Sequence, residues 1–132
     1  MEEPIERPKV HSYKDLIVWQ KAMDLVTEMY SLTESLPETA KQNLGASIRQ
    51  AATQVPTSIA DGWGRKSSKY YAQAVSKARG SLCELETLLL LAEALNYIEN
   101  IEDFSNEIMQ ISKMLNGLLK SISNKSEQTN HH

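Results

Sequence analysis

Apolar residues recur at steps of three and four along most of the chain, which is the spacing of one buried helix face. The first stripe includes Trp19, Met23 and Tyr30 and predicts a helix from about Lys14 to Leu36. The helix ends there because the next residue is a proline, which disfavours the helical conformation of its predecessor.

A second helix is predicted to begin at Pro37. Proline suits the first turn of a helix, because the N–H that it lacks would have no partner within the helix there. Its stripe includes Ile48 and Ile59, and the helix ends at Gly62 and Gly64. We expect these glycines to supply a left-handed cap, since glycine has no Cβ to clash in that conformation.

Two further helices follow. Ser67 or Ser68 is suited to cap the start of the third helix. Asn100 and Asp103 resemble a capping box that opens the fourth. The fourth helix extends to Ile122, with a heptad-like stripe that is typical of a helix packed in a bundle.

Four amphipathic helices with short connections predict an all-α fold, with an up-down-up-down antiparallel four-helix bundle as its architecture. The bundle occupies residues 13–122. We expect the polar ends, residues 1–12 and 123–132, to be disordered or extended tails.

Pro56 lies in the middle of the second helix, where it removes a backbone hydrogen bond at a cost of about 3 kcal/mol if nothing compensates. The apolar spacing continues in phase on both sides, so one kinked helix is favoured over two helices. Such a kink either redirects Trp63, Arg65 and Lys66 at the helix end or only wraps the helix around its neighbours.

Four consecutive leucines in the third helix point all around it, so one core face cannot bury them. Leu88, Leu91 and Leu95 form a second stripe opposite the core-facing one. Exposed contiguous apolar surface usually marks an interface, and we therefore predict self-association through this stripe. The alternative is a tilted helix whose two stripes are both covered within one chain.

Charge is distributed unevenly along the 132 residues, which carry a formal net charge of −3. Between Lys41 and Leu82 the only acid is Asp61, so this segment carries +6 and the remainder −9. A local positive field attracts anions that the net charge would repel, although the same bases equally suit acidic neighbours within the fold. The seven bases are Lys41, Arg49, Arg65, Lys66, Lys69, Lys77 and Arg79.

Side chains suited to catalysis or metal binding are sparse. The only histidines are His11 and the terminal pair, so the sequence has neither a Glu-x-x-His di-iron motif nor a zinc-binding set. Ser67 and Ser68 have no neighbouring histidine as base. The lone Cys83, among helix formers, is expected to be a buried and unreactive thiol. We predict a protein that is not an enzyme and needs no cofactor or metal.

No apolar run approaches the roughly 20 residues of a membrane span. The first residues are also too polar for a signal peptide. The sequence therefore predicts a cytoplasmic protein without a membrane partner.

Three blocks of the sequence, "DLIVWQKAMDLV", "SIRQAATQVPTSIADGWGRKSS" and "KARGSLCELETLLLLAEALNYI", carry a family resemblance. In their order and spacing they resemble the small four-helix-bundle proteins encoded in intervening sequences of bacterial 23S ribosomal RNA genes, also called S23-like. The similarity covers about residues 15–120. The chain departs from the family pattern at Gln50 (usually Arg), Ser58 (Asn), Asp61 (Glu) and Trp63 (Phe or Tyr).

This resemblance implies a four-helix bundle that assembles into a homopentamer and has no established biochemical activity. Accessory variability determinants of diversity-generating retroelements are more distantly similar, and the resemblance to them implies a reverse transcriptase partner and RNA binding through basic surface. The change at Gln50 removes one positive charge, which weakens any nucleic-acid role carried over.

One hypothesis is a non-enzymatic homo-oligomer that binds RNA or DNA mainly through phosphate contacts. Trp63, if exposed, would stack on an unpaired base, although a Trp at this helical spacing more often lies in the core. The candidate nucleic-acid-binding residues are Arg49, Arg65, Lys66, Lys69, Lys77 and Arg79.

The other hypothesis is a protein–protein adaptor, with a reverse transcriptase or a ribosomal component as partner. Arg65 and Arg79 would then pair with Glu84 and Glu86, within or between subunits. The candidate interface residues are Leu88, Leu91, Leu95, Arg79, Glu84 and Glu86.

Overall fold

The computed structural model describes the backbone of residues 10–130 and the side chains of residues 10–125. Within this range the protein has four long helices and no strand, so the predicted all-α fold class is confirmed. The helices are α1 (Ile17–Glu34), the short α2 (Glu38–Ala40), α3 (Ala46–Gly64), α4 (Ser68–Ala94) and α5 (Glu102–Asn130). A 3-10 turn (Tyr13–Asp15) precedes α1, and a π-helical turn (Lys41–Gly45) joins α2 to α3.

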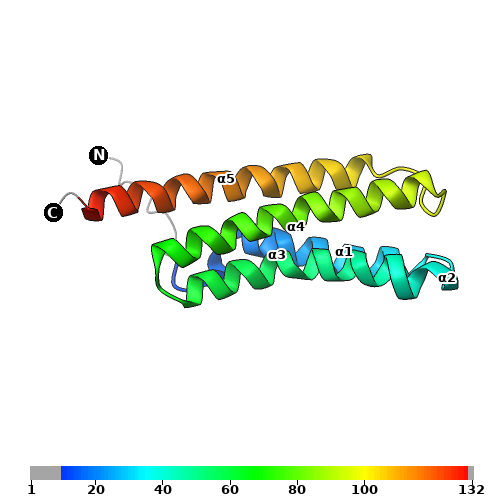
Figure 1. Cartoon of the computed structure of the whole chain (residues 1–132), viewed down its shortest axis with the longest axis horizontal. Helices are drawn as coiled ribbons and strands as arrows, with labels where there is room; N and C mark the ends of the chain where they lie inside the picture. Colours follow the sequence, from blue (N-terminus) through cyan, green and yellow to red (C-terminus); the bar gives the residue numbers. More distant parts are fainter. Residues whose placement is uncertain (1–9, 131–132) are drawn as a thin grey trace, which may run out of the picture.

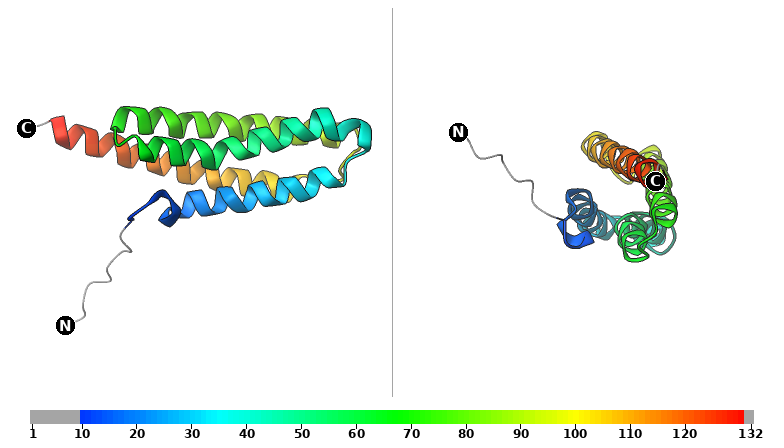
Figure 2. Two further views of the ribbon diagram at one scale, coloured as in Figure 1. Left: turned by 90° about the horizontal axis from the view of Figure 1, so that it is seen from below. Right: turned by 90° about the vertical axis from the view of Figure 1, so that its left-hand side faces the viewer.

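The long helices lie lengthwise beside one another (Figure 1). The chain passes from α1 through α2 to α3 at one end of the molecule and from α3 to α4 at the other, and the loop to α5 returns to the first end. Seen end-on, α1 lies beside α3, α3 beside α4 and α4 beside α5 (Figure 2). The contact between α3 and α4 is the most extensive, and it brings the end of α3 against the start of α4.

The core consists mainly of the apolar stripes of α3, α4 and α5, which confirms the periodicity predicted for these helices. Branched apolar side chains at steps of three and four bury one face of each helix against its neighbours. The buried members include Ile48, Val55, Ile59, Ala78, Leu82, Leu85, Leu89, Ile108, Ile111 and Leu115.

The buried face of α1 differs from the predicted one. Met23 and Tyr30 are 39% and 46% exposed, whereas Ala22, Leu25 and Met29 are fully buried. The face through Ala22 has the same helical spacing as the predicted stripe, one position away. The prediction was wrong because periodicity alone does not choose between two adjacent apolar faces.

α3 remains helical through Pro56, so the prediction of one helix rather than two is confirmed. Pro56 itself is buried. One residue further on, Thr57 Oγ1 donates a hydrogen bond to the carbonyl of Thr53 over 2.9 Å. A kink at Pro56 stays a prediction.

Neither glycine near the end of α3 adopts a left-handed conformation, so the predicted glycine cap was wrong. The left-handed residue is Lys66, with φ of 54°. Gly62 is required for packing and not for a cap, because an added Cβ there would lie 2.5 Å from the Cβ of Ala74 on α4. Gly62 therefore permits the close approach of α3 and α4.

The cap predicted for α4 is confirmed at Ser67, whereas among the described residues only the Asn100 half of the capping box predicted for α5 is present. Ser67 Oγ accepts a hydrogen bond from the Tyr70 N–H (3.4 Å), and Asn100 Oδ1 accepts one from the Glu102 N–H (2.8 Å). α5 continues past Ile122 to Asn130, so the segment predicted as an irregular C-terminal tail is helical over most of its length.

At the N-terminus, Ser12 belongs to the predicted tail but caps the 3-10 turn, with its Oγ accepting from the Lys14 N–H. The rest of that tail, residues 1–9, and the last two residues, 131–132, lie outside the described residues. Ser12 therefore belongs to the folded structure and not to the predicted tail.

Candidate nucleic-acid interface

A hollow of about 430 Å³ lies between the end of α3 and the start of α4. The α3 side chains recur in steps of about four residues and therefore share one helix face, which lies opposite the matching face of α4. We call this site the basic hollow. It is lined by Thr57, Ser58, Asp61 and Arg65 of α3 and by Tyr70, Gln73, Ala74 and Lys77 of α4.

Arg65 is held in the basic hollow without being buried. Its Nε donates to both carboxylate oxygens of Asp61 at 3.2 Å, one helical turn earlier. Its guanidinium carbon lies 5.9 Å from the centroid of the Tyr70 ring. Both side chains of the ion pair are more than half exposed, so the pair orients Arg65 while stabilising the fold little.

Two adjacent tyrosines point to different environments at the start of α4. Tyr71 is half-buried and meets Trp63 edge-on, with ring centroids 6.1 Å apart. Burial raises the pKa of the Tyr71 phenol to about 12, and among the described residues its hydroxyl has no hydrogen-bond partner. Tyr70 instead lines the basic hollow and is 51% exposed.

Trp63 is half-buried and engaged by Tyr71, which favours the structural interpretation of this residue over base stacking. The sequence analysis missed Tyr70 as the exposed aromatic residue of this region. A signal was present, because successive residues of a helix are 100° apart and two adjacent tyrosines cannot share one face.

The structure brings together only part of the predicted basic set. Arg65 and Lys77 line the basic hollow. Lys66 and Lys69 are exposed in the segment between α3 and the lining residues of α4. Arg79 is exposed further along α4 and does not line the basic hollow.

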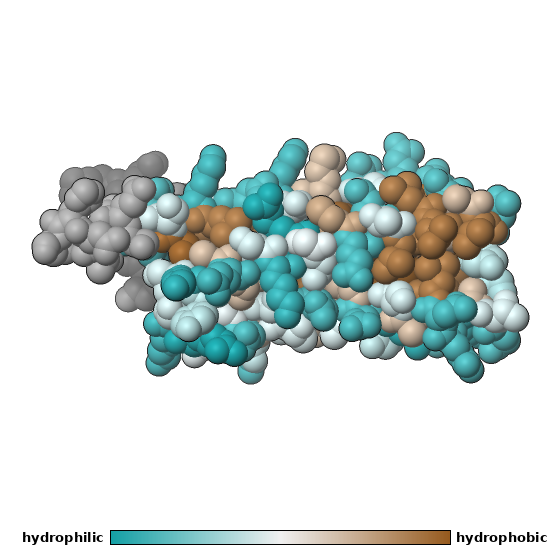
Figure 3. Space-filling model, viewed as in Figure 1, coloured by the Kyte–Doolittle hydropathy of each residue, from teal (hydrophilic) through white to brown (hydrophobic). Residues whose placement is uncertain are grey.

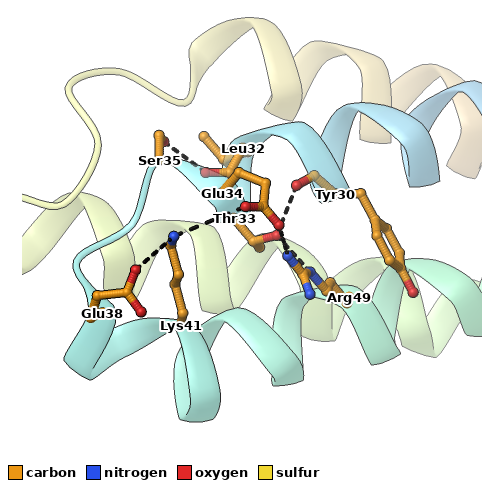
Figure 4. Close-up of polar contacts among 8 residues, drawn as sticks. All are labelled: Tyr30, Leu32, Thr33, Glu34, Ser35, Glu38, Lys41 and Arg49. Carbon is orange, nitrogen blue, oxygen red and sulfur yellow. Dashed lines mark hydrogen bonds and ion pairs between the residues drawn. The ribbon is translucent and has the colours of Figure 1, made fainter.

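Arg49 lies in a different environment, between α1 and α3 (Figure 4). Its Nε donates to Thr33 Oγ1 at 2.7 Å, and its Nη2 donates to Glu34 Oε1 at 2.8 Å. The guanidinium carbon lies 4.9 Å from the centroid of the Tyr30 ring. Lys41 adds contacts to Glu34, at 4.0 Å, and to Glu38. Arg49 therefore ties α3 to the end of α1.

A second hollow, of about 710 Å³, follows the C-terminal part of α4. We call it the leucine groove; Leu88, Leu91 and Leu95 line one side, and Leu44 and Tyr97 are among its other members. Leu91 and Leu95 are 47% and 48% exposed, whereas Leu88 is partly buried and packs against the core, so the chain covers the predicted stripe only at Leu88. The space-filling view shows a large apolar patch over this end of α4 (Figure 3).

A family model matches the chain over residues 14–117, the segment from the turn before α1 into α5. The family is described as 23S rRNA-intervening sequence protein. The chain belongs to this family. The match confirms the resemblance found in the three sequence blocks. No curated protein matches the chain.

Some predicted features of this 23S rRNA-intervening sequence protein need correction. Cys83 is exposed, not buried, because it lies on the outer side of α4 next to the buried Leu82. Arg65 pairs with Asp61, and within the described part of the chain no ion pair joins Arg79 to Glu84 or Glu86. Their pairing between subunits stays a prediction.

The described residues of this family member lack two other kinds of feature. They contain no group of three or more side chains placed to hold a metal ion. None of their helices is long and apolar enough to cross a membrane.

Proposed function

We propose that this 23S rRNA-intervening sequence protein is a non-enzymatic homo-oligomer that binds nucleic acid through the basic hollow. The observation that carries the proposal is the convergence of Arg65 and Lys77 beside the exposed ring of Tyr70. Lys66 and Lys69 extend the positive charge next to the basic hollow, and Asp61 is its only acid. Several basic side chains close together are suited to bind phosphate groups. Contacts with phosphates dominate the affinity of proteins for nucleic acid.

The proposal includes an up-down-up-down bundle that assembles as a homopentamer. The short connections and the order of helix contacts support the bundle topology. The half-exposed Leu91 and Leu95 in the leucine groove support self-association, because apolar surface of this kind favours a partner that covers it. Repetition around a ring would multiply the charge of the basic hollow.

A second candidate function is that of a protein–protein adaptor, for a reverse transcriptase or a ribosomal component. The leucine groove is the observation that favours it, since the same exposed leucines suit an apolar partner surface. Under this alternative, substituting Arg79 and Glu86 together breaks assembly, whereas under the nucleic-acid proposal assembly persists.

The first experiment measures binding of the purified protein to structured RNA over a salt series, with the native mass recorded in the same buffer. We expect a particle several times 14.9 kDa whose affinity falls steeply with salt. Lys69→Glu should weaken binding without changing the mass. Lys113→Glu, on the exposed surface of α5, makes the same charge change and should leave binding nearly unchanged. An oligomer without RNA affinity at low salt contradicts the proposal.

A further inference from the structure

We propose that the basic hollow receives an unpaired nucleotide, with its base stacked on Tyr70 and its phosphate held by Arg65 and Lys77. This inference rests on the proposed nucleic-acid binding and names the form of nucleic acid that is bound. It assigns a ligand-binding role to Tyr70 that the basic residues alone do not require.

Tyr70 has the features of a stacking platform. It is 51% exposed although its neighbour Tyr71 is used in packing, so the fold does not need the Tyr70 ring for its core. It lies on the first turn of α4, which Ser67 caps, and this fixes its backbone. An aromatic ring on a rigid element stacks on a base with little loss of conformational entropy.

Arg65 is positioned to complete such a site. Asp61 holds it through Nε alone, so within the described residues the terminal nitrogens of the guanidinium have no side-chain partner. Those nitrogens are the donors that recognise phosphate in pairs. Lys77 lines the basic hollow from α4, and a phosphate between the two helices would meet cations from both.

The shape of the site favours an unpaired nucleotide over a duplex. In a duplex each base is stacked between its neighbours, so its face is not available to a protein side chain. A duplex would meet the cations through its phosphates and leave Tyr70 without a role. The basic hollow is open to solvent, so a nucleotide would reach the Tyr70 ring without a change in the fold.

The test compares fluorescence anisotropy titrations of three probes of one sequence: a 12-nucleotide single-stranded RNA, the matching single-stranded DNA and a DNA duplex. Tyr70→Leu keeps apolar bulk but removes the ring, and it should weaken single-strand binding by about five-fold to a hundred-fold. Tyr70→Phe keeps the ring and should bind like the wild type. Helical circular dichroism confirms that each variant is folded.

Tyr30→Leu is the matched control, because Tyr30 is also exposed beside an arginine but lies in the Arg49 contact. It should leave the affinity for all three probes unchanged. Equal affinity for RNA and DNA single strands, or tighter binding of RNA through its 2′-hydroxyls, both support an unpaired nucleotide.

Three results overturn the inference, and they separate it from the proposed function. If the wild type binds no probe at low salt, both fail. If the duplex binds as tightly as the single strands, only the inference fails. If Tyr70→Leu binds single strands as the wild type does, nucleic-acid binding stands and the stacking role of Tyr70 is wrong.

Discussion

The structure contains the same pair of side chains twice, an arginine over a tyrosine ring, in two different settings. Arg49 lies 4.9 Å from the Tyr30 ring centroid, and it also contacts the fully buried Thr33 and the carboxylate of Glu34. Arg65 lies 5.9 Å from the Tyr70 ring and has one carboxylate partner on its own helix. The first pair connects two helices, whereas the second is open to solvent at a hollow.

This comparison shows that residue type does not decide whether an arginine serves stability or binding. The Arg49 side chain is 32% exposed, and two of its five N–H donors bind partners on α1, one from Nε and one from Nη2. The Arg65 side chain is 58% exposed and uses Nε alone for its ion pair. An arginine anchored at two atoms to a neighbouring helix is less free to turn toward a ligand than one held through Nε alone by its own helix.

The largest effect should follow from Gly62→Ala, because the new Cβ would lie 2.5 Å from the Cβ of Ala74 and 3.3 Å from the Cα of Tyr71. We expect the free energy of unfolding to fall by about 2–3 kcal/mol, the upper part of the range for an overpacked core. Urea denaturation followed by circular dichroism measures it. The basic hollow should be disturbed and the Arg49 contact preserved.

Gly64→Ala is the matched control, since an added Cβ at Gly64 meets nothing within 4 Å and its φ is not positive. It should stabilise the protein by about 0.5–1 kcal/mol, the usual gain of Ala over Gly in a helix. Equal losses of stability in the two variants would show that the approach of α3 to α4 is not limited by Gly62.

The next effect separates the two arginines by stability. Arg49→Ala should lower the free energy of unfolding by about 1–2 kcal/mol, because buried Thr33 loses a charged hydrogen-bond donor. Arg65→Ala should change it by less than about 0.5 kcal/mol, since its ion pair is exposed. Arg49→Lys should not restore stability, because lysine lacks the planar fork that contacts two partners. Similar losses at both positions would contradict the comparison.

The sequence was sufficient to predict the features that depend on local spacing. The core-facing stripes of α3, α4 and α5 were predicted correctly, even though α4 carries a second apolar stripe near its end, whereas α1 has two adjacent apolar faces and the wrong one was chosen. Ser67 was a correct cap and Asn100 accepts a hydrogen bond at the start of α5, because such contacts join residues only two or three positions apart. These features require no knowledge of the tertiary fold.

Features that depend on contacts between helices were not predictable in this way. Gly62 at a helix end indicated a cap, but its actual constraint is Ala74 on the next helix. Arg49 and Arg65 had equal standing as candidate bases. Asp61 lies one turn before Arg65 on the same helix, but this local pair does not reveal which of the two arginines contacts a neighbouring helix. The difference arises because Arg49 faces Thr33 on α1 and Arg65 faces the basic hollow.

A smaller effect should separate the same two arginines by nucleic-acid affinity. Arg65→Gln should reduce the slope of log affinity against log salt by about 0.7, the value for one lost phosphate contact to a single strand. Arg49→Gln should leave the slope unchanged, because Glu34 and Thr33 already occupy Arg49. Anisotropy titrations with single-stranded RNA at several salt concentrations measure both. A reduced slope for Arg49→Gln would show that Arg49 also contacts the nucleic acid.

A pH-dependent effect concerns the other side of α1, where carboxyl groups of α1 and α5 meet rather than an arginine and a carboxylate. Burial at the contact between α5 and α1, together with Glu28 and Asp24, raises the pKa of Glu107 from 4.5 to about 7, with Lys21 opposing the shift. Between these values the folded protein keeps a proton that the unfolded chain has lost, so stability falls as pH rises. The melting temperature should therefore be lower at pH 8 than at pH 5.

Glu107→Gln tests this directly, because glutamine keeps the shape of the protonated carboxyl and does not titrate. In this variant most of the fall in melting temperature between pH 5 and pH 8 should disappear. Arg49→Ala should lower the melting temperature at both pH values and retain the fall, because its contacts join α1 to α3 rather than to α5. An unchanged pH dependence in Glu107→Gln would mean that another group controls it. The pH dependence of stability would then not distinguish the contact of α1 with α5 from its contact with α3.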